Sequence, residues 1–227
     1  MKPKMSIVIP VLNEGGRLIE SLQSLQRLRT DCELLVVDGG SSDDSLSLAT
    51  PLADKILSAP RGRAKQMNAG AAEATGDILL FLHADTSLPS GATQTISDAV
   101  QQGHQWGRFD VSFDSNQTIF KLIALMMNLR SRITGIATGD QALFVTRSAF
   151  DAIDGFPDIA LMEDIAISNR LKKLAQPFCL NEKVTTSARR WQQNGVLKTI
   201  LLMWRLRLAY FFGADPSKLA AYYYRRS

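Results

Sequence analysis

The sequence of 227 residues contains only two cysteines, Cys32 and Cys179, and their spacing matches no metal-binding or disulfide pattern. A scaffold held together by disulfides is therefore excluded, and we expect a reducing, cytoplasmic environment. The sequence also lacks an uncharged apolar run of about 18 residues, which argues against a helix that crosses a bilayer. The apolar run at residues 5–11 is too short for a secretory signal, so none is expected.

A glycine-rich phosphate loop is missing after the first predicted strand, where residues 10–14 read PVLNE. This absence argues against a nucleotidyltransferase of related sheet, which would carry such a loop there. Residues 187–227 hold eight Lys or Arg against one Asp, while the whole chain has a net charge of +4. A basic tail suggests an anionic partner. No nucleic-acid-binding motif accompanies it, so we expect a membrane surface and no nucleic acid.

Hydrophobic residues make up 45% of the sequence, enough for a substantial core. Short β-branched runs alternate with segments of helical periodicity, a pattern typical of an α/β fold with a mainly parallel central sheet flanked by helices. Strands are predicted at residues 5–11, 31–38, 55–58, 78–83, 106–114 and 141–146, with strands or loops at 177–180 and 184–187. Helices are predicted at residues 17–28, 42–53, 64–74, 91–102, 119–129, 147–153, 165–174 and 196–212.

The segment GDILLFLHADT, residues 76–86, predicts a strand buried on both faces. The strand ends in His83, Ala84 and Asp85, which places an imidazole and a carboxylate at the carboxyl edge of the sheet. Open α/β sheets bind their ligands at this edge. Asp85 alone would equally suit a residue that only stabilises the following turn, and the segment by itself leaves both interpretations open.

Three cations lie among small residues just before and within the helix predicted at residues 64–74: Arg61, Arg63 and Lys65. The free N–H groups and the dipole at the start of a helix favour an anion. A solvated basic loop is the alternative. We favour the anion site because this helix leads directly into the buried strand that ends near Asp85.

The segment VLKTILLMWRLRLAYFF, residues 196–212, is strongly apolar and carries three cations. This composition fits a helix at a membrane interface, or a core helix with long cationic stems that reach water. We favour contact with a membrane or a partner. The chain is accordingly divided into an α/β domain at residues 1–190 and a basic amphipathic helical extension at residues 191–227, which packs on the domain or on a membrane surface.

Several motifs occur together in order: PVLNE (10–14), VVDGGSSDD (36–44), RGRAKQMNAGAAEATGDILLFLHADT (61–86), GDQALFVTRSAF (139–150), DGF (154–156) and MEDIAISNRLKK (162–173). Over about the first four-fifths of the chain this arrangement resembles the family 2 glycosyltransferases of GT-A fold. The resemblance implies a metal-dependent, inverting transfer of a sugar from a nucleotide-sugar donor to an acceptor hydroxyl.

The resemblance also assigns residues to roles. In the family an Asp-x-Asp motif binds Mn²⁺ or Mg²⁺; here His83 stands in the first position, so Asp85 and His83 are the expected metal ligands. Imidazole suits Mn²⁺ better than Mg²⁺. Asp164, with Glu163 beside it, matches the expected general base. Arg190 and Trp191 match a motif that contacts acceptor or diphosphate. The residues implied in nucleotide-sugar binding are Pro10, Asn13, Glu14, Asp38, Arg63, Lys65, Asn68, His83, Ala84 and Asp85.

The expected function is therefore glycosyl transfer to an acceptor that is lipid-linked or otherwise amphipathic, on the cytoplasmic face of a membrane. The altered positions His83 and Gly39, where the family usually has acids, leave a second hypothesis: a catalytically inactive module that binds a nucleotide or attaches to a membrane. A nucleotidyltransferase of related fold is the third. No feature of the sequence indicates an oligomeric state.

Overall fold

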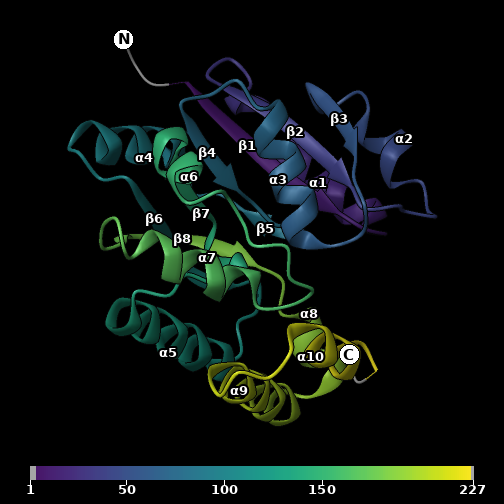
Figure 1. The fold of residues 1–227 in the computed structure, drawn as a ribbon. Helices are drawn as coiled ribbons and strands as arrows, with labels where there is room; N and C mark the ends of the chain where they lie inside the picture. Colours follow the sequence, from purple (N-terminus) through teal and green to yellow (C-terminus); the bar gives the residue numbers. More distant parts are fainter. Residues whose placement is uncertain (1–3, 226–227) are drawn as a thin grey trace.

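The computed structural model describes residues 4–225, which form one mixed sheet with helices on both faces (Figure 1). The strand order is β3-β2-β1-β4-β7-β6-β8-β5. The strands are β1 (Met5–Val11), β2 (Cys32–Asp38), β3 (Lys55–Ser58), β4 (Ile78–Phe81), β5 (Thr86–Ser87), β6 (Trp106–Phe113), β7 (Leu143–Thr146) and β8 (Phe178–Thr186). The α-helices are α1 (Gly15–Leu25), α2 (Ser45–Ala49), α3 (Arg63–Glu73), α4 (Ala92–Gln101), α5 (Thr118–Thr134), α6 (Arg147–Ala152), α7 (Glu163–Leu171), α8 (Arg189–Asn194), α9 (Val196–Phe211) and α10 (Pro216–Tyr224). Short 3₁₀ turns occur at Gln26–Leu28 and Gly139–Gln141.

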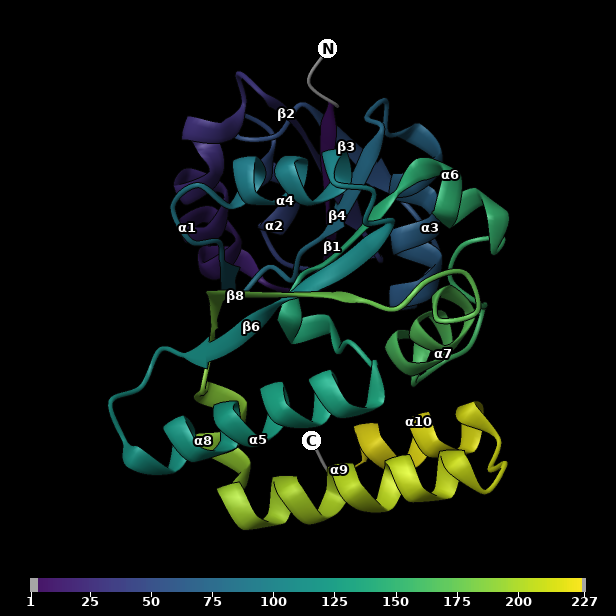
Figure 2. The same ribbon diagram turned by 90° about the vertical axis from the view of Figure 1, so that its left-hand side faces the viewer.

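The central strands are buried on both faces because their side chains alternate between two apolar clusters. In β1, Ile7 and Ile9 pack with one cluster and Val8 with the other. The first cluster includes residues of α1 and α4, and the second includes residues of α3, α6 and α7. Figure 2 shows these two groups of helices on opposite sides of the sheet. The short apolar runs in the sequence therefore form the middle layer of a three-layer α/β fold.

The order in which the chain adds strands to the sheet reverses at β1. From β1 it passes outward to β2 and β3, and then returns through α3 to place β4 on the other side of β1, parallel to it. The loops that follow β1 and β4 thus lie beside each other at the carboxyl edge. Such a topological switch point forms the ligand-binding crevice of open α/β sheets.

The second half of the sheet is mixed. Strand β7 is antiparallel to both β4 and β6, β6 and β8 are parallel, and β5 pairs antiparallel with β8. The prediction of a GT-A-type α/β sheet flanked by helices is confirmed, with four parallel and three antiparallel pairings. The two late segments predicted as strands or loops form one strand, β8, whose register shifts opposite Phe109 and Asp110.

The C-terminal helices fold back against the domain. The predicted boundary at residues 190/191 falls inside α8, and α10 returns to pack Leu219 and Tyr223 against Met162 and Leu206. Periodicity alone predicted neither α8 nor α10. Across residues 4–225, no helix combines the length and the apolarity that crossing a bilayer requires.

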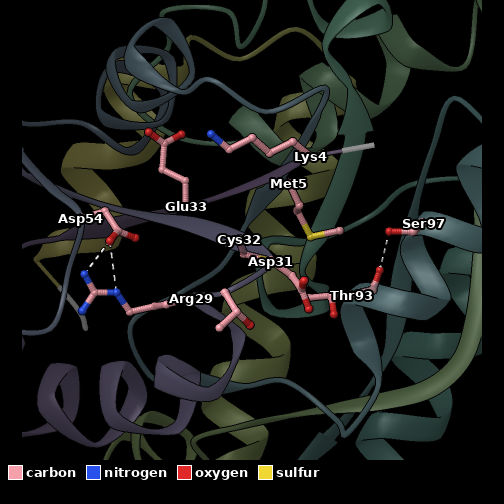
Figure 3. Close-up of a pocket in the computed structure, with 10 residues that line it drawn as sticks. Lys4, Met5, Arg29, Asp31, Cys32, Glu33, Asp54, Thr93 and Ser97 are labelled. Atoms are coloured by element: carbon pink, nitrogen blue, oxygen red, sulfur yellow. Dashed lines mark hydrogen bonds and ion pairs between the residues drawn. The ribbon is translucent and has the colours of Figure 1, made fainter. Parts of the chain in front are cut away.

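A hollow at the opposite, amino edge of the sheet is drawn in Figure 3. It is lined by Lys4 and Met5 at the start of β1 and by Cys32 and Glu33 at the start of β2. The guanidinium of Arg29 reaches across it to the Asp54 carboxylate. Because parallel strands present their ligand-binding loops at the carboxyl edge, this hollow is not the candidate site.

Candidate active site at the carboxyl edge of the sheet

Two carboxylates lie within electrostatic reach of each other at the switch point. Glu14 follows β1 and Asp85 follows β4, and both are partly buried. Burial raises the pKa of Glu14, and the nearby Asp85 carboxylate raises it further, although Arg17, Arg63 and Arg190 act in the opposite direction. The sequence thus places Asp85 correctly at the edge, and the fold brings cations from α3 and α8 to the same place.

His83 pairs with a carboxylate that the sequence analysis did not select. Its Nδ1 lies 3.3 Å from Oδ1 of Asp140, and its side chain is 12% exposed. The other side of the ring touches Gly139, where an added Cβ would lie 2.3 Å from Nε2. Although burial acts to raise it, the pKa of Asp140 is lowered by the hydrogen bond and charge of His83, and by Arg63 and Arg190. His83 therefore ties the end of β4 to the turn before β7.

Arg63, at the start of α3, lies among the acidic groups of this edge. Desolvation acts to lower the pKa of Arg63, but Glu163 and Asp140 raise it above its usual value. Glu163, one of these acidic groups, has a raised pKa. Burial is the main cause and the charge of the adjacent Asp164 is the second, whereas the charge of Arg63 lowers this pKa. The edge thus holds a cation between carboxylates, which favours a ligand that carries both phosphate and polar groups.

Glu163 and Asp164 begin α7, where the helix dipole stabilises negative charge. Glu163 is buried, whereas Asp164 is partly exposed, and its Oδ1 accepts a hydrogen bond of 2.7 Å from the Ile165 amide. Met162, just before them, has the left-handed φ of 71° that favours glycine. Asn13 and Ala142 share this conformation, with φ of 55° and 49°. Backbone strain in the loops around a site is typical of functional positions.

Helix α10 covers part of the same edge. The OH of Tyr223 accepts a hydrogen bond from Nη1 of Arg190, and the Arg190 guanidinium lies over the Tyr223 ring, 5.6 Å from its centroid. Arg61 approaches the ring of Tyr224 at 5.8 Å. The basic tail therefore contributes to the wall of the site.

Several more of the predicted site residues have partners within the protein. Asp38 accepts hydrogen bonds from the amides of Gly40 and Ser41 and so closes its own loop. Asn68 bonds both the amide and the carbonyl of Phe156, at 2.9 and 2.8 Å. Lys65 lies 3.8 Å from Asp158, and Trp191 packs edge-on against Phe113. These residues shape the surrounding loops. Of the other predicted residues, Pro10 lies near the end of β1, beyond the part paired with β4. Asn13 accepts a hydrogen bond from the Ser42 amide, and Ala84 is buried.

Sequence reasoning missed Asp140, Tyr223 and Gln66. Asp140 lies just before a strand in a quoted motif, which was the available signal; its pairing with His83 depends on the antiparallel register of β4 and β7. Gln66 is buried and donates hydrogen bonds to the carbonyls of Val11 and Val37, which joins the ends of β1 and β2. Tyr223 could not be found because α10 returns from the far end of the chain.

Within residues 4–225, no three His, Cys, Asp or Glu side chains lie close enough to hold a metal ion by themselves. The partly exposed Asp85 carboxylate is nevertheless the kind of donor that Mg²⁺ and Mn²⁺ use together with substrate phosphates and water. The residues present therefore fit an ion that is shared with a diphosphate. The Nδ1 of His83 has a carboxylate partner, and its metal-binding role stays a prediction.

Residues 6–152 match the model of glycosyl transferase family 2. The chain is 32% identical over 154 residues to the undecaprenyl-phosphate 4-deoxy-4-formamido-L-arabinose transferase of Klebsiella pneumoniae, covering 60% of this chain and 46% of the relative. It is 40% identical over 94 residues to a PGL/p-HBAD biosynthesis glycosyltransferase of Mycobacterium bovis, covering 38% and 37%. The chain thus spans less than half the length of these relatives.

Solved structures share the fold. The crystal structure of Staphylococcus aureus TarS residues 1–349 matches with a TM-score of 0.66 at 18% identity, covering 82% of this chain and 60% of that one. The mannosyltransferase PcManGT of Pyrobaculum calidifontis, in complex with GDP-Man and Mn²⁺, matches with a TM-score of 0.60 at 22% identity, covering 92% and 61%. With the family match over most of the domain, these findings show that the chain belongs to glycosyl transferase family 2 and has the GT-A fold.

Proposed function

We propose that this protein transfers a sugar from a nucleotide-sugar donor to an acceptor hydroxyl with inversion at the sugar carbon. The observation that carries the proposal is the convergence at one sheet edge of Asp85 after β4, Glu163 and Asp164 at the start of α7, and Arg63 between them. A donor diphosphate needs positive charge, and an acceptor hydroxyl needs a base. This edge supplies both.

The donor would lie over the switch point. Arg63 and Arg190 suit its phosphates, since both are near the acidic cluster and guanidinium groups bind phosphate in a bidentate way. Glu14 and Asn13 line the loop after β1, on the side where the nucleoside is expected. The solved relatives bound to UDP-GlcNAc and to GDP-Man support a nucleotide-sugar without selecting its base.

Asp164 is the proposed general base because it is the more exposed of the two adjacent carboxylates. Glu163 is buried behind it and has a raised pKa, from burial first and from Asp164 second. We therefore assign Glu163 the role of positioning Arg63 through their electrostatic interaction. Asp164 would remove the proton of the acceptor hydroxyl as the new bond to the sugar forms.

Mn²⁺ or Mg²⁺ is the proposed cofactor, with Asp85 as its main protein ligand. When bound, such an ion would neutralise the charge that develops on the departing diphosphate. Within the protein, His83 and Asp140 hold the turn on which the ion and the donor would rest. The manganese in the related mannosyltransferase complex supports this choice.

The acceptor is proposed to be lipid-linked, and the protein to attach peripherally to the cytoplasmic face of a membrane. Helices α5 and α9 each expose an apolar stripe beside the site: Ile119, Leu122, Met126, Leu129 and Ile133 on the first, and Leu197, Leu201, Trp204, Leu208 and Phe211 on the second. Lys121, Lys198 and Arg205 are exposed on the same helices. Apolar stripes with flanking cations suit an anionic membrane surface. The name of the Klebsiella relative, an undecaprenyl-phosphate 4-deoxy-4-formamido-L-arabinose transferase, supports this interpretation.

The test is a thermal-shift screen of nucleoside diphosphates and their sugars, with and without Mn²⁺. One nucleotide is expected to raise the melting temperature only when metal is present, as a ligand specific for the folded state does. Asp85→Ala should abolish this metal-dependent shift, while Asp151→Ala, an exposed acid on α6, should leave it unchanged. If no nucleotide shifts the wild-type protein, the transferase proposal fails and the non-catalytic module gains support.

A further inference from the structure

Arg130, near the end of α5, has an unpaired guanidinium edge. Its Nε and Nη2 are buried and make no hydrogen bond within residues 4–225, and the hydroxyl of Ser21 is the one other buried side-chain atom in that range with no partner. Nε and Nη2 lie on the same edge of the guanidinium and together donate the two parallel hydrogen bonds that grip a carboxylate or phosphate. Because buried polar groups are normally paired, an edge left open in this way indicates a ligand.

A second arginine lies beside it. Helices α5 and α9 run side by side in the same direction (Figure 2), and Ile123 and Ile200 belong to one apolar cluster between them. Arg130 and Arg207 each follow seven residues later, two helical turns along the same face. Burial lowers the pKa of Arg130 to about 10, and the charge of Arg207 acts in the same direction, so the two guanidinium groups lie within electrostatic reach of each other.

Within residues 4–225, neither cation has a hydrogen-bonded carboxylate partner. No ion pair of Arg130 or Arg207 occurs in the part of the chain that the structure describes. Arg108, a third cation near Arg130, is by contrast fully engaged: it donates to Ser131 and to Asp110. Arg108 is therefore held by partners within the protein, whereas Arg130 and Arg207 remain able to bind a ligand.

These cations border the proposed base. Asp164 and Asp140 oppose the lowering of the pKa of Arg130, so their carboxylates lie within electrostatic reach of it. Tyr210, one turn after Arg207 on α9, has its pKa raised by burial and then by Asp164. The pair of arginines therefore lies within electrostatic reach of the proposed base, on the same two helices that carry the apolar stripes.

We propose that Arg130 and Arg207 bind a phosphate group of the acceptor and hold the acceptor hydroxyl next to Asp164. Two guanidinium groups match the double charge of a phosphate better than the single charge of a carboxylate. A hydrocarbon chain on that phosphate would lie along the apolar stripes. This inference rests on the proposed transferase function and specifies its acceptor as an amphipathic phosphate compound.

The experiment measures binding of dodecyl phosphate, below its micellar concentration, by tryptophan fluorescence at constant ionic strength. Trp204, 65% exposed and one turn before Arg207, is the reporter. Arg130→Gln and Arg207→Gln should each bind roughly 10- to 100-fold more weakly, as expected for lost hydrogen bonds to a charged group. Arg27→Gln and Lys173→Gln, exposed cations outside α5 and α9, should bind as the wild type does.

Two further ligands identify the source of the affinity. Inorganic phosphate, followed by thermal shift, tests the charged group alone, and dodecyl maltoside tests the hydrocarbon chain alone. Tighter binding of dodecyl phosphate than of inorganic phosphate supports a lipid acceptor, whereas equal affinities support a soluble phosphorylated acceptor. Equal binding of dodecyl maltoside and dodecyl phosphate would overturn the proposal, as would unchanged binding in the double variant R130Q/R207Q or no binding of either phosphate.

A structural role for Arg130 predicts a different pattern. Since its Nε and Nη2 have no hydrogen-bond partner among the described residues, Arg130→Gln should melt at or above the wild-type temperature, whereas loss of a structural arginine would lower it. The metal-dependent nucleotide shift, measured in the same variants, separates the two proposals. If that shift persists while wild-type protein fails to bind phosphate, only the acceptor inference is lost; if wild-type protein shows no nucleotide shift, the transferase function itself fails.

Discussion

Replacing Asp164 by asparagine removes the proposed base and changes little else. Asparagine keeps the oxygen that accepts the hydrogen bond from the Ile165 amide at 2.7 Å, so the start of α7 should remain intact. The lost interaction of the carboxylate with the helix dipole, about 0.3–1 kcal/mol, is opposed by relief of the repulsion from Glu163. We expect the melting temperature and the affinity for the donor to stay within error of the wild type.

The rate of transfer should change much more. A positioned general base contributes roughly 10²- to 10⁴-fold, so its loss raises the activation barrier by about 3–5 kcal/mol. The assay is release of nucleoside diphosphate from the donor identified by thermal shift, with a lipid extract as acceptor. Asp158→Asn is the matched control, because this aspartate lies in the loop before α7 and is 70% exposed.

The same variant allows a second measurement, by NMR titration of the Glu163 carboxyl group. Burial is the main cause of the raised pKa of Glu163, and the charge of Asp164 is the next. In Asp164→Asn the pKa of Glu163 should therefore fall toward its ordinary value. Transfer at the wild-type rate together with a lowered Glu163 pKa would refute the assignment of Asp164 as base, because the charge would have been removed without consequence.

Two other predictions concern packing and pH. Gly70→Ala should destabilise the protein by about 1–3 kcal/mol in chemical denaturation, because an added Cβ would lie 2.3 Å from Cγ1 of Val8 in the core. Gly16→Ala, where nothing lies within 4 Å, should be neutral or stabilising; equal losses in both would contradict the packing argument. Glu163→Gln should gain stability over the wild type as pH rises above 4.5, because a raised folded-state pKa penalises the ionised form in the folded state only. Denaturation at pH 4 and pH 7, with the exposed Glu20→Gln as control, measures this difference, and no change with pH would contradict it.

Local sequence patterns predicted most of the fold because they record burial directly. The apolar run at residues 78–83 can be buried on both faces only in the middle of a sheet, and Asp85 then lies at the carboxyl edge whatever the rest of the chain does. The family motifs added the start of α7, with Glu163 and Asp164. In each case the residues that predict a strand, a helix start or a site position lie within a few residues of that element in the sequence.

The partners of these residues were decided by tertiary structure alone. The pairing of His83 with Asp140 requires the antiparallel register of β4 and β7, and no spacing within the sequence encodes it. Asn68 and Lys65, which are predicted to bind the donor, contact the loop before α7 in this structure, because α3 lies against that loop. Contacts between distant segments depend on which elements pack together and in what register.

The C-terminal region shows the same division most clearly. The sequence determined that α9 would be apolar and cationic, since each cation and each apolar side chain is a property of the residue itself. Whether a given cation would be paired, exposed or left open at a site depended on its neighbours. Only the packing of α9 beside α5 brought Arg207 within electrostatic reach of Arg130, and Arg130 within reach of Asp164. Electrostatic and hydrogen-bonding partners are set by proximity in space, which the fold alone creates.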